Sequence, residues 1–289
     1  MPLLHRKIDV VLTMATGADA GVAQTLSGHR VMVSARIAGG ASMSEVTVRI
    51  FGMTASRMND FSTLGQLPTK FNANTVSILA SDDAGNMSQI FEGTILAAYA
   101  DFLAAPEVSF TITGLGGLIE ALKNTPGFSS PGPVDAAVVL QTLASQAGLS
   151  FENNGVSVML PKRTYNGSVR TQIQECIEDA RISGVIDRGA LAIWPRDGAR
   201  AGEVAVISPT KGMVGYPSYT ATGVIVTTLF NPTIRYGGTV QIEESTLRQA
   251  NGTWNVVTLV HELESEVPNG KWFTQIELVV QGQLAIPSK

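Results

Sequence analysis

The chain has 289 residues and a formal net charge of −4, and 44% of its residues are hydrophobic while only 15% are charged. The acidic balance gives no basic footprint for nucleic acid, and one cysteine, Cys176, excludes an internal disulfide and a cysteine-rich metal site. This length gives room for about two domains or three small ones. Because a typical domain has about 25% charged residues, the low value fits either a surface buried in an assembly or a strand-rich surface of Ser, Thr, Asn and Gly.

The N-terminal segment predicts a strand. Ile8, Val10 and Leu12 alternate with Asp9 and Thr13, and this period of two is typical of strands. Asp9 interrupts the apolar stretch, which argues against a signal peptide. No apolar run approaches the roughly 18 residues of a membrane span, so we expect no stable membrane association.

The chain up to residue 113 continues as strands. Alternating, β-branched segments recur at 29–37, 44–53, 74–79, 88–102 and 107–113. Residues 54–65 interrupt them with a short predicted helix, opened by Thr54 or Ser56.

The middle of the chain predicts a compact α/β unit. Gly- and Pro-rich sequence at 114–118 and 124–133 predicts a linker. Pro133 then opens a helix that Gly148 ends, and Ser168 caps a second helix. The apolar face of the first helix is Ala136, Val139, Leu140, Leu143 and Ala147. The apolar face of the second is Val169, Ile173, Cys176, Ile177 and Ala180, which makes Cys176 a small core residue. Residues 151–160 predict a hairpin or bent strand, and a strand pair turns at Asp187–Gly189.

The C-terminal part returns to strands and ends in a long hairpin. Its strands, 254–263 and 272–280, flank the turn residues Pro268, Asn269 and Gly270. Simple alternation gives the first strand apolar residues on both faces, whereas a strand with one wet face alternates cleanly. We therefore expect the hairpin to lie at a contact between subunits or domains, through Trp254, Val257, Leu259, Leu263, Trp272 and Phe273.

His261 and the carboxylates beside it do not predict a metal site. A zinc-binding helix needs a second histidine at i+4, but that position is Ser265, and His261 and Glu262 point to opposite faces of a strand. The chain also lacks a P-loop and a nucleophile elbow, and its adjacent acidic pairs diverge on strands. We therefore predict no catalytic residue, no cofactor and no metal, and a protein that is not an enzyme.

The two strand-rich ends resemble each other. NTVSI at 74–78 parallels GTVQI at 238–242, and each is followed by a turn and a long strand that an aromatic residue opens, Phe91 or Trp254. Each final strand contains Phe-Thr. The sequence therefore predicts one β-barrel unit occurring twice, with the boundaries 1–113 for the first barrel, 114–208 for the linker and α/β insertion, and 209–289 for the second barrel.

Residues 208–280 resemble a known family. The segments 211–245, 251–265 and 269–278, with the motifs NP-x-I-x-x-G at 231–237 and HE-x-E-S at 261–265, are similar to the C-terminal part of phage baseplate hub proteins, which are akin to the base of the type VI secretion spike. The upstream order of barrel, insertion and second barrel agrees. The resemblance implies a β-rich α+β fold with two tail-tube-like barrel or sandwich domains and a small α/β domain between them.

The resemblance also implies a function. Three copies, each with two barrels, would form a pseudo-hexameric ring in the baseplate of the virion, after assembly in the host cytoplasm. That homotrimer would join a hexameric tail tube or distal tail protein to a trimeric central spike, contact other baseplate proteins, and pass DNA only in transit. Since the resemblance assigns every segment of these 289 residues, we expect no lytic domain among them.

Two other classes remain open at this stage. One is a carbohydrate-binding or adhesive virion protein that uses Trp254 and Trp272 as sugar platforms. The other is a tail-associated peptidoglycan hydrolase.

Overall fold

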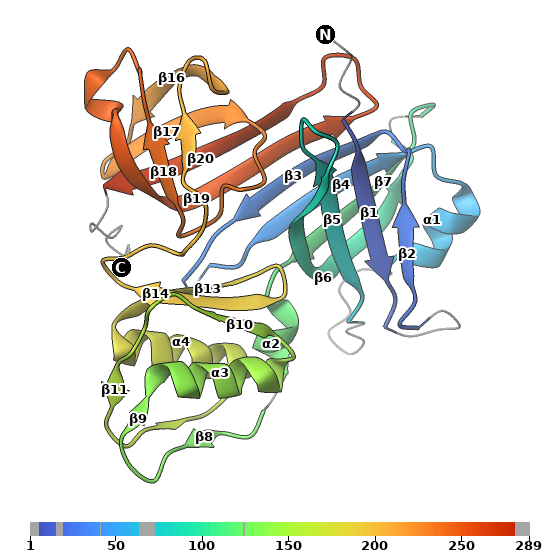
Figure 1. The fold of residues 1–289 in the computed structure, drawn as a ribbon. Coiled ribbons are helices and arrows are strands. Elements are labelled where there is room, and N and C mark those ends of the chain that lie inside the picture. Colours follow the sequence, from blue (N-terminus) through green and yellow to red (C-terminus); the bar gives the residue numbers. More distant parts are fainter. Residues whose placement is uncertain are drawn as a thin grey trace.

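The computed structural model describes residues 6–15, 20–40, 42–63, 73–103, 105–123 and 125–280. Most strands belong to one long sheet, and a small α/β unit lies beneath one end of it (Figure 1). The predicted β-rich α+β class is confirmed. No helix among the described residues is long and apolar enough to cross a membrane.

The first β unit is an antiparallel sheet in the order β3-β4-β7-β6-β5-β1-β2. Its strands are β1 (Ile8–Thr13), β2 (Ala23–Leu26), β3 (Val31–Ile37), β4 (Glu45–Phe51), β5 (Thr75–Ser81), β6 (Met87–Asp101) and β7 (Ser109–Leu115). Helix α1 (Ala55–Phe61) follows β4, and Thr54 caps it by accepting a hydrogen bond from the amide of Arg57. The predicted helix is confirmed, but it is shorter than expected, because the chain is already extended at Ser62. The last two residues of the expected range, 64–65, lie outside the described residues.

The second β unit repeats this arrangement in the order β16-β17-β20-β19-β18-β15. Its strands are β15 (Ala205–Ile207), β16 (Met213–Tyr219), β17 (Gly223–Leu229), β18 (Thr239–Ile242), β19 (Gly252–Ser265) and β20 (Trp272–Val280), with a 3-10 turn, η1 (Arg248–Ala250), before β19. Taken in this order, the six strands correspond to β3, β4, β7, β6, β5 and β1 of the first unit, so that β16 is the counterpart of β3 and β19 is the counterpart of β6. The predicted duplication is therefore present in the strand order, except that β15 pairs with β18 in parallel whereas β1 pairs with β5 antiparallel.

The long strand of each unit carries a β-bulge at the equivalent place. The bulge in β6 leaves Leu96 unpaired with β7, and the bulge in β19 leaves Val257 unpaired with β20. Counting from these residues makes Ala98, Ala100 and Phe102 the counterparts of Leu259, His261 and Leu263.

The two β units share one hydrophobic core. Strand β19 of the second unit pairs with β3 of the first, which joins both sheets into one, and the buried side chains form a single cluster through both. The largest fully buried members are Trp272, Phe91 and Phe110.

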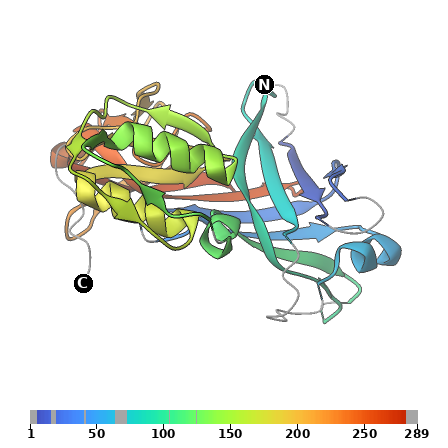
Figure 2. The ribbon, with the colours of Figure 1, turned by 90° about the horizontal axis from the view of Figure 1, so that it is seen from below.

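The insertion has its own core. Helices α3 (Ala136–Ala147) and α4 (Val169–Ala180) cover one face of a small sheet in the order β10-β14-β13 (Figure 1). Its elements also include α2 (Leu118–Leu122), β8 (Phe128–Ser129), β9 (Val134–Asp135), β10 (Ser150–Asn153), β11 (Met159–Leu160), β12 (Thr164–Tyr165), β13 (Ile182–Asp187) and β14 (Ala190–Pro195). Seen from below, the insertion lies toward one end of the long sheet, and β1, β2 and α1 lie at the other (Figure 2).

Several predictions for the insertion are confirmed. Ser168 caps α4, Gly148 ends α3 with a φ of 80°, and Arg188 and Gly189 form the turn between β13 and β14. Cys176 is fully buried, and burial raises the pKa of its thiol to about 12, as expected of an inert core residue.

Other predictions for the insertion were wrong. Helix α3 begins at Ala136 and not at Pro133, and Asp135 caps it, because its carboxylate accepts a hydrogen bond from the amide of Ala137. Residues 151–160 do not form a hairpin, since β10 pairs with β14 and β11 pairs with β9.

One strand lies inside the expected linker, and another lies on the other side of the expected boundary at 208–209 from the strand it pairs with. Within the expected linker, β8 pairs with β12 of the insertion, and β15, which falls before 209, pairs with β18 of the second β unit. Glycine and proline content therefore marks where the chain turns, not where one unit ends. We propose the three-part division with the second unit beginning at β15.

Candidate assembly interface

The C-terminal hairpin turns its large side chains inward. Of the predicted contact residues, Trp254, Leu259, Leu263 and Trp272 are buried in the shared core, and Val257 and Phe273 are partly exposed on the opposite face. The bulge at Val257 shifts the alternation by one residue, which places Trp254 on the same face as Leu259. The expected division of β19 into two apolar faces was therefore wrong: one face is buried and the other is mostly polar.

Strand β19 lies at the junction of the two β units. Its residues from Leu259 to Ser265 pair antiparallel with β3, from Ile37 to Val31. On the outer face Ser34 donates a 2.6 Å hydrogen bond to Glu262, and Lys271 lies 3.6 Å from the same carboxylate. Part of the hairpin thus pairs with the other β unit of the same chain.

His261 is a core residue of this junction. Its side chain is 3% exposed, its Nδ1 lies 2.9 Å from the hydroxyl of Thr274, and its ring packs edge-on against Phe230. Burial, together with the nearby Arg188 guanidinium, lowers the pKa of His261 to about 3. The imidazole is therefore neutral near pH 7, and the described part of the chain contains no cluster of three metal-ligating side chains.

The tryptophans are poorly placed to act as sugar platforms. Trp254 is 8% exposed and donates its indole N–H to the carbonyl of Ala250, while Trp272 is 2% exposed. A stacking platform needs an open ring face. The feature that favoured a carbohydrate-binding protein is therefore absent from these two residues.

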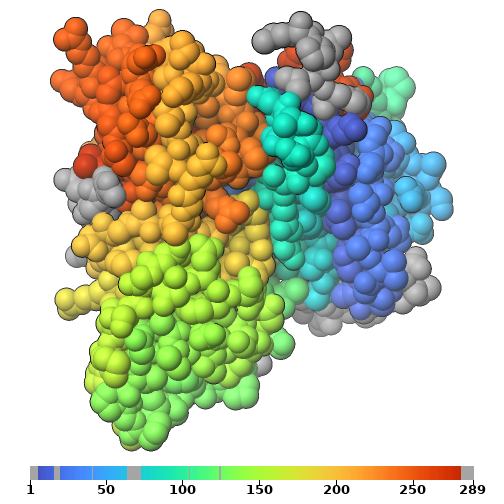
Figure 3. Space-filling view, viewed as in Figure 1, coloured from blue at the N-terminus to red at the C-terminus, as the bar shows by residue number. Residues whose placement is uncertain are grey.

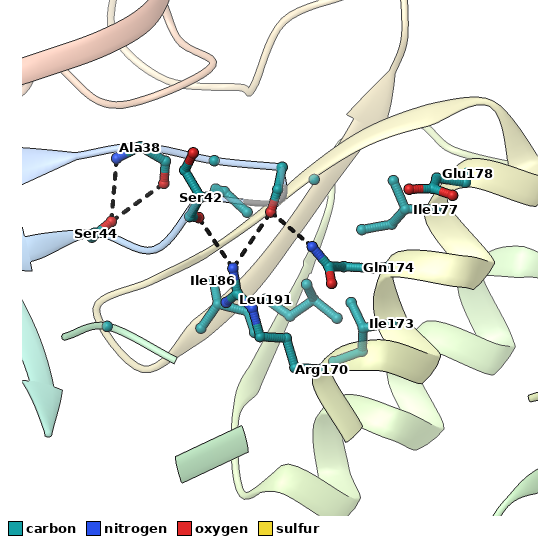
Figure 4. Close-up of a pocket in the computed structure, with 15 residues that line it drawn as sticks. Ala38, Ser42, Ser44, Arg170, Ile173, Gln174, Ile177, Glu178, Ile186 and Leu191 are labelled. Carbon is teal, nitrogen blue, oxygen red and sulfur yellow. Dashed lines mark hydrogen bonds between the residues drawn. The ribbon is translucent and has the colours of Figure 1, made fainter. Parts of the chain in front are cut away.

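The insertion is attached to the first β unit through α4. Arg170 donates hydrogen bonds to the carbonyls of Gly40 and Ser42, and Gln174 donates to the carbonyl of Gly40 (Figure 4). A small cavity of about 100 Å³ lies beside these bonds, lined on the insertion side by apolar residues such as Ile173 and Ile177. Two side chains of one helix thus hold the loop between β3 and β4.

Among the strand edges that no described strand covers, two are equivalent to the edges that meet at the junction of the two β units. Strand β16 is the last strand of the long sheet, and after Thr94 no strand pairs with β6 on the side away from β7. Apolar side chains are exposed at both places: Tyr99, Phe102 and Leu103 at the end of β6, and Val214, Tyr216 and Tyr219 on β16. These edges are the counterparts of β19 and β3, which pair with each other inside the chain.

A comparison with known protein families identifies the kind of protein that has this fold. The family described as baseplate hub gp41 matches residues 7–274. The chain belongs to this family. It is a structural component of a phage tail baseplate, and the family resemblance noted in its sequence is confirmed.

Solved structures of tail proteins share the fold of this baseplate hub. A tail protein from Neisseria meningitidis MC58 has a TM-score of 0.61 at 7% identity over 94% of this chain and 97% of that one. The 43 kDa tail protein of prophage MuSo2 from Shewanella oneidensis has a TM-score of 0.60 at 7% identity, over 96% and 99%. The E. coli c3393 protein, a type VI secretion component similar to T4 gp27 and gp5, has a TM-score of 0.56 at 7% identity, over 93% and 76%. No curated protein matches this chain by sequence.

Sequence reasoning missed the structural basis of the hub's junction. The pairing of β19 with β3 joins residues more than 200 positions apart, and no local pattern marks it. The duplication itself was a usable signal, because equivalent strands imply equivalent edges.

Proposed function

We propose that three copies of this hub form a closed ring in which every β unit contacts the next through the same kind of junction. The observation that supports it is the pairing of β19 with β3, two strands whose counterparts β6 and β16 each have a side that no described strand pairs with. Pairing β6 of one copy with β16 of the next would repeat the internal junction between copies. Such a contact is heterologous and closes when the rotation per unit divides a full turn.

The expected register follows from the internal junction. Ala35 pairs with His261, and the counterparts of these residues are Tyr219 and Ala100. Thr63 already forms hydrogen bonds with the backbone N–H and C=O of Ala98. Pairing of β6 with a neighbouring copy would therefore start beyond this residue, at Ala100. Pro217 lies in β16 at its bulge, a position typical of edge strands. Pairing there would bury the exposed aromatic residues of both edges.

A ring of this kind suits a symmetry adaptor. Three chains with two β units each would present six similar units to a hexameric tail tube or distal tail protein, and three insertions to a trimeric spike. The channel would pass the genome, and the protein would act in the virion without catalysing a reaction. The similarity of the fold to a type VI secretion component supports these partners.

A cysteine pair tests the junction between copies. We expect Ala100→Cys combined with Tyr219→Cys to give disulfide-linked trimers in assembled tails under oxidising conditions. Opposed residues of an antiparallel pair have Cβ atoms about 4.5–5.5 Å apart, and a disulfide needs about 3.5–4.5 Å, so a small local shift of the backbone brings the two sulfur atoms together. The single variants control for random oxidation, and Cys176 is buried. Assembled tails that contain the double variant but no linked chains would refute the pairing.

A further inference from the structure

A polar cavity lies where the two β units and the insertion meet. It consists of two hollows that share Arg200 and Arg235: one of about 320 Å³, here called the inner cavity, and one of about 370 Å³, here called the outer hollow. In Figure 3 the teal segment of β5 and β6, the gold segment after β14 and the orange segment with the β17–β18 loop come together on this face. The charged residues that line the inner cavity are Glu152, Asp187, Arg188, Arg200 and Arg235.

Arg200 forms the buried floor of this cavity. Its side chain is 2% exposed and lies 2.9 Å from Glu152 and 2.9 Å from Asp187. Its Nε also donates to Glu152, which makes that pair bidentate. Hydrogen bonds from Arg200 lower the pKa of the Glu152 carboxyl, so this carboxylate stays ionised near neutral pH. Arg200 is therefore paired with both carboxylates that line the inner cavity.

Arg188 lies at the tip of the insertion and contacts the first β unit. It donates one hydrogen bond to the carbonyl of Gln89 at 2.8 Å and lies 3.3 Å from Asp187. A guanidinium has five N–H donors, so Arg188 keeps donors beyond these two contacts.

Arg235 has no such partner. Its side chain is exposed, and among the described residues it forms no hydrogen bond or ion pair. Although the residue as a whole is exposed, partial desolvation of its guanidinium by the surrounding protein, and then the neighbouring guanidiniums of Arg188 and Arg200, lower the pKa of Arg235. Glu203 lines the outer hollow and Glu92 lies beside Gly189, but neither pairs with Arg235. The inner cavity thus holds three guanidiniums against two carboxylates.

We propose that this cavity binds one carboxylate of a partner protein, with Arg235 and Arg188 as its donors. One added negative charge brings the net charge of the cavity side chains to zero. A phosphate dianion would make the net charge negative and would also lie beside the carboxylates of Glu152 and Asp187. A planar carboxylate also matches the guanidinium fork. The source is an acidic side chain or a chain terminus, and binding it would fix the three parts of the chain together. This inference does not rest on the ring proposed above.

Arginine side-chain NMR on the full chain tests the site. The side-chain probe is N-acetylglutamate N-methylamide, the terminal probe is N-acetylalanine, and N-acetylglutamine N-methylamide is the uncharged control. We expect a carboxylate probe to shift the Nε–H signals of Arg235 and Arg188 in a saturable way. The tighter of the two probes identifies the source.

Matched variants make the result specific. Arg235→Gln should weaken binding by about tenfold, the loss of one charge-assisted pair of hydrogen bonds. Arg248→Gln, at another exposed arginine, should leave it unchanged. Glu203→Gln should strengthen it, because one competing negative charge is removed. Shifts of equal size at Arg248, shifts that do not saturate, or tighter binding of inorganic phosphate would each overturn the proposal.

Discussion

The two β units use one strand order but differ in what covers their long strands. In the second unit the C-terminal half of β19 pairs with β3, so Leu259, His261 and Leu263 are buried. In the first unit no described strand pairs with the matching half of β6 on that side, where Thr63 bonds to Ala98, and Phe102 is 60% exposed. The same position is therefore a core site in one unit and a surface site in the other. A duplicated fold can in this way supply one internal junction and leave a matching edge for the next copy.

The largest contrast is expected between Leu263→Asp and Phe102→Asp. Leu263 is fully buried at the internal junction, so an unpaired carboxylate there should reduce the free energy of unfolding by about 3–5 kcal/mol. Phe102→Asp should leave stability nearly unchanged, within about 0.5 kcal/mol, because that side chain is exposed in the single chain. Urea denaturation of both purified variants measures the difference.

Phe102→Asp should have a small effect on stability but a large effect on assembly. Tail formation in complementation assays should be lost for this variant although its chain folds normally. A folded Phe102→Asp chain that assembles as well as the wild type would show that the end of β6 is not a junction.

The other edge gives the second prediction. Tyr216 is 74% exposed on β16, so Tyr216→Asp should change the melting temperature by no more than a few degrees and still block ring formation. Val22→Asp, at an exposed residue near β2, is the control and should assemble. If both variants assemble equally well, β16 is not part of the interface between copies.

His261 distinguishes the units in their response to pH, because its counterpart in β6 is Ala100. The pKa of His261 is about 3 in the folded chain and about 6.5 when exposed, so only the unfolded chain takes up this proton between these values. Stability is thus fully present above pH 6.5 and falls below it, by about 2 kcal/mol at pH 5. His261→Gln should lack this part of the pH dependence in urea denaturation at pH 7.5 and 5.0. An unchanged pH dependence in the variant would mean that His261 is not buried as a neutral ring.

An effect on stability smaller than that of Leu263→Asp is expected where α4 holds the first β unit. Arg170→Met removes hydrogen bonds to the carbonyls of Gly40 and Ser42 and should reduce the free energy of unfolding by about 1–3 kcal/mol. Gln174→Met removes one exposed bond and should cost less. Limited proteolysis near residues 196–202 should accelerate in Arg170→Met more than in Gln174→Met. The opposite ranking would indicate that the insertion is held elsewhere.

Local chemistry predicted much of this fold, and long-range pairing did not follow from it. Caps such as Thr54 and Ser168 act within a few residues of the helices they begin, so the sequence is sufficient to find them. The bulge at Val257 has no glycine or proline to mark it, and it reversed the predicted faces of part of β19. The arginine cavity was not predicted, because Glu152, Asp187, Arg200 and Arg235 meet only after the insertion folds against both β units.

The most direct test of the ring is a reconstruction of the assembled tail that counts hub chains and β units. The account predicts three chains and six β units, with β6 of each chain beside β16 of the next. Six chains or one chain per tail, or three chains that meet through other strands, would contradict it.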